Sequence, residues 1–177
     1  MRIVQGRFAN RRLTSPGGRV RPTAETVRDR WISLLEPHLE GARVLDLFAG
    51  TGAVGLEALS RGARYVDFVE NGAESLHALK ANVAALRVKD RARIFKRDAI
   101  PFVEALPEGA YDIALADPPY LSAKLLRIVE QWRAVPFARI LSVEHAVTQE
   151  LPVRGRFVDV EDTRITVLLA GRHSNGG

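Results

Sequence analysis

Val44-Leu-Asp-Leu-Phe-Ala-Gly-Thr-Gly-Ala-Val-Gly55 is the stretch that decides the fold. The apolar residues from Val44 to Phe48 predict a buried strand, and the glycines predict a tight turn that leads into a helix near Ala53. An apolar strand followed by Gly-x-Gly-x-x-Gly is typical of an α/β sheet whose backbone approaches a nucleotide-like ligand. Asp46 is unusual inside such a strand, because a buried carboxylate is costly without a partner. That partner is either an ammonium group or the backbone of the glycine turn.

Strand and helix patterns alternate along the rest of the chain. Strands are predicted at 43–48, 65–70, 92–98, 111–116 and 140–144, with a terminal hairpin at 157–161 and 165–170. Helices are predicted at 53–61, 75–86, 101–106 and 121–132. A further helix, with Thr23 as its N-cap, precedes the first strand and presents Val27, Trp31, Leu34 and Leu35 on one face. This alternation predicts an α/β fold with a doubly wound, parallel sheet.

Polar residues end several of these strands. Right-handed crossovers bring the carboxyl ends of parallel strands to one edge of the sheet, where ligands bind. Phe48 to Gly52, Glu70, Asp98 and Asp117 to Tyr120 all fall at that edge. Glu70 follows the glycine turn by about 20 residues, where a carboxylate can accept both hydroxyls of a ribose; the alternative is a surface glutamate. Asp98 can accept an adenine amine or cap a helix, and both interpretations stay open.

Asp117-Pro-Pro-Tyr120 is the most specific motif in the sequence. The two prolines form a stiff bend, because they lack backbone donors and restrict φ. The Asp117 carboxylate and the Pro118 carbonyl then provide two adjacent acceptors that can fix a planar –NH2 group, while Tyr120 can stack on the ring that carries it. The alternative is a rigid strand-to-helix turn with a core tyrosine.

Length and composition narrow the class of protein. At 177 residues we expect one domain. The chain has no cysteine, which excludes disulfides, thiolate zinc sites and cysteine nucleophiles. His38, His77, His145 and His173 lie far apart in sequence, so we expect no metal site. No signal peptide or membrane span is apparent, and we expect a cytoplasmic protein.

Positive charge is concentrated at the N-terminus. Residues 1–30 contain eight arginines and two acidic residues, a net charge of +6 against +5 for the whole chain. Such a segment, predicted to form a hairpin of residues 2–4 and 11–14, suggests an arm that contacts phosphates; the alternative is a solvated basic surface. Arg28 lies off the apolar face of the first helix, where we expect it to reach a ligand.

These residues resemble those of class I S-adenosylmethionine-dependent methyltransferases. Asp46 to Gly52 resembles their first motif, and Asp117 to Tyr120 resembles the (Asn/Asp/Ser)-Pro-Pro-(Tyr/Phe/Trp) motif of enzymes that methylate amino groups of bases. Arg2-Ile-Val-Gln-Gly6, Arg11-Arg-Leu13, Arg21-Pro-Thr23 and Phe48 to Ala58 make nearly the whole chain similar to the small-subunit ribosomal RNA guanine-N2 methyltransferase family. The resemblance implies a seven-stranded sheet of order 3-2-1-4-5-7-6 with an antiparallel strand 7, preceded by an N-terminal β-hairpin.

The resemblance also implies roles for individual residues and for parts of the chain. The catalytic residues would be Asp117, Pro118, Pro119 and Tyr120. S-Adenosyl-L-methionine would contact Asp46, Phe48, Ala49, Gly50, Thr51, Gly52, Glu70, Asn71, Asp98, Ala99 and Asp117. Ribosomal RNA, free or within an assembling particle, would contact Arg7, Arg11, Arg12, Arg21, Thr23 and Arg28. The expected organisation is an RNA-binding arm at 1–22, a monomeric methyltransferase domain at 23–171 and a frayed tail at 172–177.

The sequence departs from the family in three places and leaves other functions open. Gln5 and Asn10 replace glycines in the hairpin, Asn71 follows Glu70 where an acid is frequent, and residues 162–164 replace a Tyr-Gly. One alternative is an amine methyltransferase acting on DNA adenine, another RNA or a protein glutamine. A nicotinamide-dependent oxidoreductase would also fit the glycines and Glu70, although not the Pro-Pro motif. The third alternative is an RNA-binding module without catalysis.

Overall fold

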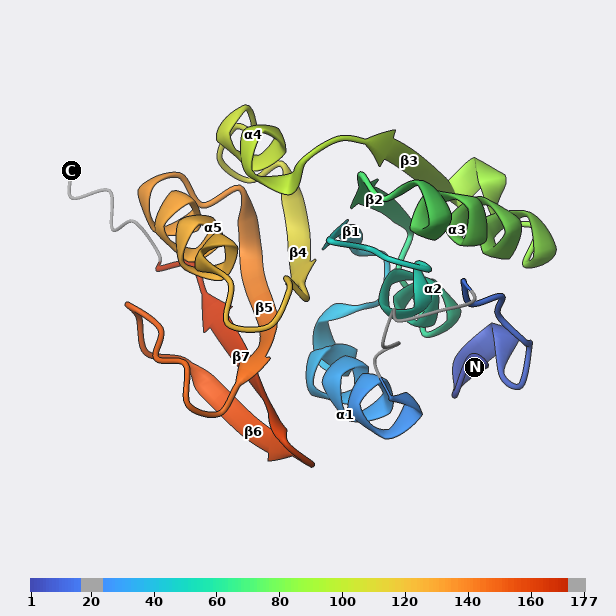
Figure 1. Ribbon diagram of the computed structural model, residues 1–177, viewed down its shortest axis with the longest axis horizontal. Coiled ribbons are helices and arrows are strands. Elements are labelled where there is room, and N and C mark those ends of the chain that lie inside the picture. The colour runs from blue at the N-terminus through green and yellow to red at the C-terminus, as the bar shows by residue number, and fades with distance from the viewer. Residues whose placement is uncertain (17–23, 172–177) are drawn as a thin grey trace.

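The computed structural model describes residues 1–16 and 24–171, which form a seven-stranded sheet flanked by helices (Figure 1). The strands are β1 (Arg43–Leu47), β2 (Tyr65–Glu70), β3 (Ala92–Lys96), β4 (Tyr111–Ala116), β5 (Ala138–Ala146), β6 (Arg156–Val160) and β7 (Thr163–Leu169). The α-helices are α1 (Glu25–Leu35), α2 (Ala53–Ser60), α3 (Ala73–Ala85), α4 (Ala99–Glu104) and α5 (Ala123–Ala134). Three 3-10 turns complete the described part: η1 (Gly6–Phe8), η2 (Glu36–His38) and η3 (Lys89–Arg91).

The strand order is β3-β2-β1-β4-β5-β7-β6, which confirms the order that the family resemblance implied. β1 pairs in parallel with both β2 and β4, and β7 is antiparallel to both of its neighbours. Leu47, near the end of β1, lies beside Val69 of β2 and Ala116 of β4. The carboxyl ends of the central strands therefore meet at one edge of the sheet.

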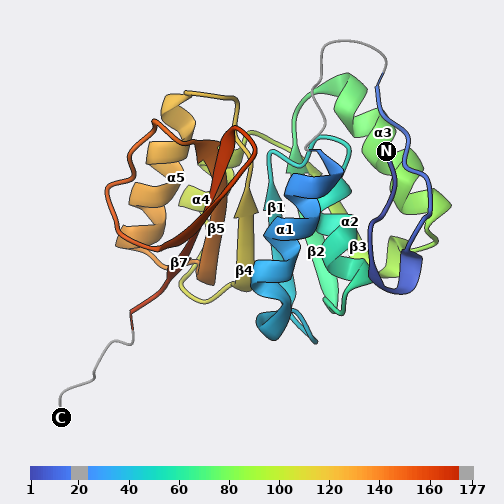
Figure 2. The same ribbon diagram turned by 90° about the horizontal axis from the view of Figure 1, so that it is seen from below.

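Helices cover both faces of the sheet, as Figures 1 and 2 show. Side chains of β1 alternate between two hydrophobic clusters because successive residues of a strand point to opposite faces. Val44 packs in the cluster that contains α1 and α2 residues such as Trp31 and Leu56. Leu45 and Leu47 pack in the other cluster, with residues of α4 and α5. The glycine turn after β1 thus emerges between the two layers.

α3, α4 and α5 begin at different residues from those the sequence pattern predicted, and α3 begins at Ala73 rather than at 75. α4 begins at Ala99 rather than at 101, because the Asp98 side chain accepts the Ile100 N–H and caps the helix. α5 begins at Ala123 rather than at 121, because Leu121 has a φ of 54° and Ser122 caps the helix by accepting the Lys124 N–H at 3.0 Å. In α4 and α5 a polar cap, rather than the apolar periodicity, sets the first residue.

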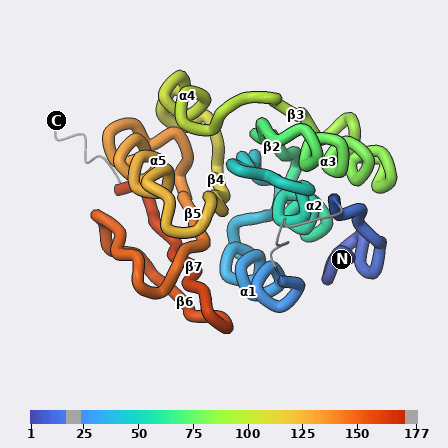
Figure 3. The backbone as a smooth tube through the Cα atoms, viewed as in Figure 1, coloured from blue at the N-terminus to red at the C-terminus, as the bar shows by residue number. Residues whose placement is uncertain are grey.

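The N-terminal hairpin is shorter than predicted. Its antiparallel pairing is a single bridge between Arg2 and Arg12, supported by backbone hydrogen bonds of 2.9 Å between Ile3 and residues 10 and 11. The predicted strand 2–4 ends early because the Val4 amide, like its neighbour, donates to the Glu57 side chain instead of to the other strand. η1 then turns the chain back, in the blue segment near the label N (Figure 3).

The first segment of the chain packs against the rest of the molecule. Ile3, Phe8 and Leu13 are buried in the same cluster as α1, α2 and β1. Thr23, the predicted N-cap of α1, lies outside the described residues; the helix begins at Glu25, and its N-cap position is Ala24, which makes no side-chain cap hydrogen bond. The predicted tail at 172–177 also lies outside them. Within residues 1–16 and 24–171, no helix is long and apolar enough to cross a bilayer.

Candidate active site

The glycine loop between β1 and α2 is shaped by close packing. Gly52 has a φ of 79°, and a Cβ there would lie 2.3 Å from the Leu79 Cδ1 atom. A Cβ at Gly55 would lie 2.5 Å from the Phe68 ring and 2.8 Å from a carboxylate oxygen of Asp46. Glycine is therefore required at both positions: a side chain at Gly52 would be strained by the positive φ and would meet Leu79 of α3, and one at Gly55 would push α2 away from the sheet.

Asp46 lies beneath this loop and is almost completely buried, with 3% of its surface exposed. Its Oδ2 atom accepts the Gly55 N–H at 2.9 Å. The structure thus shows a backbone partner for this carboxylate, one of the two that the sequence allowed. Burial raises the pKa of Asp46 to about 8, with smaller contributions from the negative charges of Asp117 and Glu70. A cation at this site would reverse that shift.

The raised pKa predicts an unusual effect of pH on stability. An aspartate with a pKa near 8 in the folded state and an ordinary value of 3.8 in the unfolded state binds more protons when folded. Its contribution to stability is therefore lost as pH rises from about 4 to 8. Asp46→Asn, which keeps the acceptor for Gly55, should be more stable than wild type at pH 8.5, by on the order of 2 kcal/mol. The advantage should disappear towards pH 5.

Urea unfolding at pH 5 and pH 8.5 measures this difference. Asp112→Asn is the matched control, because Asp112 hydrogen-bonds Arg43, which lowers its pKa despite partial burial. Its contribution is present above pH 4, so that variant should lose stability at both pH values. If the difference in free energy of unfolding between Asp46→Asn and wild type were the same at pH 5 and pH 8.5, the raised pKa of Asp46 would be contradicted.

Glu70, at the end of β2, links two loops of the site. One carboxylate oxygen accepts the Gly50 N–H at 2.7 Å, and the other accepts the N–H groups of Asn71 and Gly72 at 2.9 and 2.7 Å. Glu70 is half-buried at the end of its strand, and its partners are backbone N–H groups. It holds the glycine loop against the β2–α3 turn.

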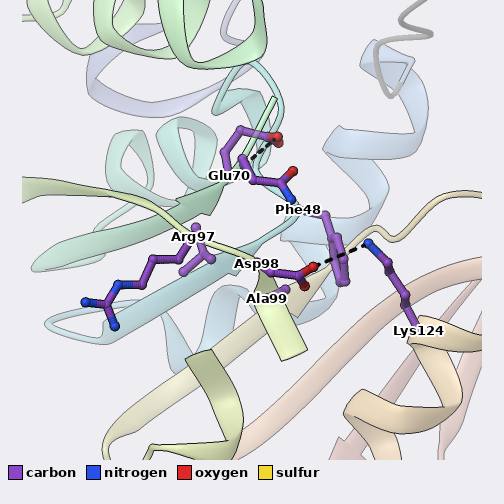
Figure 4. Close-up of a pocket in the computed structure, with 8 residues that line it drawn as sticks. Phe48, Glu70, Arg97, Asp98, Ala99 and Lys124 are labelled. Carbon is purple, nitrogen blue, oxygen red and sulfur yellow. Dashed lines mark hydrogen bonds and ion pairs between the residues drawn. The ribbon is translucent and has the colours of Figure 1, made fainter. Parts of the chain in front are cut away.

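A pocket lies beside Glu70 and contains residues from three strand ends (Figure 4). Asp98 both caps α4, through its Oδ1 atom, and faces Lys124, whose Nζ atom is 4.0 Å from Oδ2. The Lys124 ammonium is also 5.8 Å from the centre of the Phe48 ring. Arg97 points away from these side chains in Figure 4. The lining residues are Phe48, Val69, Glu70, Asn71, Arg97, Asp98, Ala99 and Lys124.

Lys124 was not predicted from the sequence, although a signal for it exists. It lies in the first turn of the helix that follows the Pro-Pro motif, and the beginning of that helix must lie at the same edge of the sheet as the end of β4. A cationic side chain at this place supplies positive charge next to the Asp98 carboxylate. The pocket therefore combines an aromatic wall, two carboxylates and a lysine.

The Asp117–Tyr120 motif follows directly after β4, next to the glycine loop. Asp117 is half-buried and Pro118 is buried, whereas Tyr120 is 61% exposed. The Tyr120 hydroxyl donates to the Asp162 carbonyl at 3.2 Å, which ties the motif to the turn between β6 and β7. The alternative of a core tyrosine is therefore wrong, because the ring is open to a ligand on the surface.

The arginines predicted to contact RNA have different environments. Arg7 and Arg12 are exposed, and Arg11 is exposed but donates to the Ala85 carbonyl at 2.8 Å. Arg21, like Thr23, lies outside the described residues. Arg28 is completely buried, and its guanidinium pairs with the Glu57 carboxylate. The prediction that Arg28 reaches a ligand is wrong, because the cluster of buried charges at Glu57 holds its side chain inside.

Glu57 is the centre of that buried cluster and was missed by the sequence analysis. It accepts the N–H groups of Val4 and Gln5 at 2.8 and 2.9 Å. It also pairs with Arg28 and with Arg61, and the Arg61 Nη2 atom lies 2.8 Å from Glu57 Oε1. A glutamate in the otherwise apolar first turns of α2 was the available signal. Through Glu57, the N-terminal segment is attached to the helix that begins at the glycine loop.

No group of three or more histidine, aspartate or glutamate side chains in the described part of the chain could hold a metal ion. The sheet order and the glycine loop define a class I, Rossmann-like methyltransferase fold. A solved Escherichia coli structure titled "Putative methyltransferase yhhF" matches it with a TM-score of 0.81 and 29% identity, covering 94% of this chain and 96% of that one.

The chain belongs to the family described as "Conserved hypothetical protein 95", whose family model matches residues 1–166. It is similar to the Ribosomal RNA small subunit methyltransferase D of Escherichia coli (strain K12), at 33% identity over 86% of this chain and 78% of that protein. It is also similar to the "Putative rRNA methyltransferase YlbH" of Bacillus subtilis (strain 168), at 31% identity over 86% of each.

Proposed function

We propose that the protein transfers a methyl group from S-adenosylmethionine to the exocyclic N2 amine of a guanine in small-subunit ribosomal RNA. The observation that supports this proposal is the pairing of Leu47 with Ala116, because Asp117 to Tyr120 and the glycine loop follow these two residues at the same edge of the sheet. The names of the relatives support ribosomal RNA as the substrate. The guanine N2 position rests on the resemblance of the motif and of the N-terminal segment.

The residues at the edge of the sheet fit the cofactor by their chemistry. Asp46 is a buried carboxylate whose raised pKa a bound ammonium group would lower again. The Glu70 oxygens accept backbone N–H groups, and the remaining acceptor sites of the carboxylate can accept the hydroxyls of a ribose. Phe48 and the Asp98 carboxylate provide an aromatic wall and an acceptor for an adenine. S-Adenosylmethionine, when bound there, supplies the methyl group.

The Pro-Pro motif would do the chemistry by orientation. The lone pair of a guanine N2 amine is delocalised into the base, so the site must align the nitrogen with the methyl carbon, and proximity lowers the barrier. The Asp117 carboxylate and the Pro118 carbonyl accept the two amine hydrogens and stabilise the positive charge that develops on nitrogen. A sulfonium group held there would supply the methyl group and keep the electron pair of its C–S bond on sulfur. The extra proton then leaves to Asp117 or to water.

The base must leave its stack before it can reach this motif. Tyr120 is exposed directly after the Pro-Pro bend, and its hydroxyl donates to the Asp162 carbonyl. A ring fixed at one end is a suitable surface for stacking. We propose that the protein acts as a monomer in the cytoplasm, on free RNA or on an assembling particle.

Exposed arginines of the N-terminal segment should contribute to RNA affinity. Arg7→Ala combined with Arg12→Ala should reduce the slope of log K against log salt concentration by about 1.5 and weaken RNA binding at least tenfold. S-Adenosylmethionine affinity without RNA should stay unchanged. Filter binding at several salt concentrations measures both quantities. Arg156→Ala with Arg139→Ala, two arginines of β5 and β6, is the matched control. An unchanged salt slope in the Arg7 and Arg12 variant would contradict the proposed contact between the N-terminal segment and RNA.

Methyl transfer to purified RNA tests the proposed function. The protein is incubated with methyl-labelled S-adenosylmethionine and either small-subunit RNA or small-subunit particles, and the RNA is digested to nucleosides. We expect the label in N2-methylguanosine. Label in N6-methyladenosine or in a protein would contradict the guanine assignment while keeping the methyltransferase class. Transfer to none of these acceptors would contradict the whole proposal.

A further inference from the structure

We propose that Asn82 is a positioning residue that couples the N-terminal segment to the cofactor loop, so that RNA binding and S-adenosylmethionine binding strengthen each other. The proposal rests on the proposed function, because it assumes that the segment contacts RNA. It goes further by naming the residue that links the RNA-contacting segment to the cofactor site.

The hydrogen bonds of Asn82 join two parts of the chain that are far apart in sequence. Asn82 lies in α3 and is 1% exposed. Its amide nitrogen donates to the Thr51 carbonyl at 2.9 Å and to the Thr14 carbonyl at 3.0 Å. Its amide oxygen accepts the Thr14 N–H at 2.7 Å. One buried side chain is thus fully hydrogen-bonded only when both segments are in place.

Each end of this bridge lies next to residues with a proposed role. Thr51 stands between the two glycines of the loop, and the neighbouring Gly50 N–H is the one that Glu70 accepts. Thr14 follows the buried anchor Leu13 and the exposed Arg12. Movement of the arm away from α3 would therefore break two of the three hydrogen bonds of Asn82 and release the Thr51 carbonyl from a fixed amide.

The burial of Asn82 makes its hydrogen bonds to Thr14 and Thr51 costly to break. A buried polar group without a partner is costly. The free energy therefore rises when the N-terminal segment moves away from Asn82 and the amide loses its partners there. RNA that grips exposed arginines of the docked segment favours the docked state over any other. It thereby favours the loop geometry that receives the cofactor, and the coupling must be equal in both directions.

Calorimetry on the full-length protein tests this coupling. The affinity of S-adenosylmethionine is measured with and without saturating small-subunit RNA. Wild type should bind it about fivefold more tightly with RNA, the lower end of common coupling factors. Asn82→Asp keeps the acceptor for the Thr14 N–H but removes both donors. It should bind S-adenosylmethionine about tenfold more weakly without RNA. The ratio of its S-adenosylmethionine affinities with and without RNA should be near one.

A second variant and a control keep the result interpretable. Thr14→Pro deletes the N–H that Asn82 accepts while leaving α3 and the loop unaltered, and it too should abolish the coupling. His77→Ala, on the exposed side of α3, should keep the wild-type ratio. Circular dichroism checks that each variant is folded. Steady-state kinetics should show a raised KM for S-adenosylmethionine with kcat within about twofold of wild type, since Asn82 does not touch the reacting atoms.

The outcomes separate this inference from the proposed function. A wild-type protein that binds both ligands with a ratio of one, or variants that keep the fivefold ratio, would overturn the role of Asn82 alone. A wild-type protein that does not bind S-adenosylmethionine would overturn the proposed function instead.

Discussion

Asp117→Ala should lower the rate of methyl transfer by about 10²- to 10³-fold, the usual loss when one preorganised group that stabilises developing charge is removed. The alanine cannot accept an amine hydrogen, so the amine is held only by the Pro118 carbonyl and samples unproductive orientations. Because β4 ends before Asp117 and the side chain is half-buried, the fold should be kept. Single-turnover assays at saturating S-adenosylmethionine measure the chemical step.

Asp117→Asn is the matched variant, because it keeps one acceptor oxygen and the shape of the side chain. We expect it to retain more activity than Asp117→Ala, since asparagine occurs at this position of the resembling motif. Both variants should still bind S-adenosylmethionine, which calorimetry can check. Full activity in Asp117→Ala would rule out the proposed role of the carboxylate.

Glu57→Gln should cause a large loss of stability. The substitution leaves the Arg28 guanidinium, which is completely buried, without the charge of its carboxylate partner, and it weakens the attachment of Val4 and Gln5. Breaking a buried pair from one side costs about 3 kcal/mol or more. For a chain of this size we expect a fall in Tm of roughly 10 °C.

Asp29→Asn serves as the control for that loss. Asp29 also pairs with Arg61, at 2.6 Å, but its side chain is 35% exposed, so water can replace the lost charge. Its Tm should change by less than roughly 3 °C. Differential scanning calorimetry compares the two variants under identical conditions. Equal effects of the two substitutions would show that the cluster at Glu57 is not the buried centre described above.

Much of the fold could be predicted because its signals are local. The alternation of apolar strands and helices, and the glycines after β1, depend on neighbouring residues and predicted the central sheet correctly. Three of the boundaries that the pattern missed depend on single polar side chains: Asp98 and Ser122 as caps, and Glu57 as the acceptor that ends the N-terminal strand. Such single polar contacts do not change the apolar periodicity of the sequence, so the periodicity does not reveal them. The start of α3 at Ala73 has no side-chain cap.

The same distinction applies to the candidate site. The residues at the strand ends could be predicted, since the topology of a parallel sheet brings them to one edge, and the structure places Phe48, Glu70 and Asp98 around one pocket. Arg28 was assigned to the surface because a helical pattern shows which face is apolar, and not which charges a buried glutamate pairs with. The bridge at Asn82 joins residues 31 and 68 positions away, a distance that no local pattern reports.

Mass mapping of small-subunit ribosomal RNA tests the central proposal most directly. RNA is isolated from cells that contain the protein, from cells that lack it, and from cells that carry Asp117→Ala in its place. We expect one guanine to carry an N2-methyl group only in the first sample, with the other two alike. An RNA whose methylated guanines are the same in all three samples would contradict the proposed function.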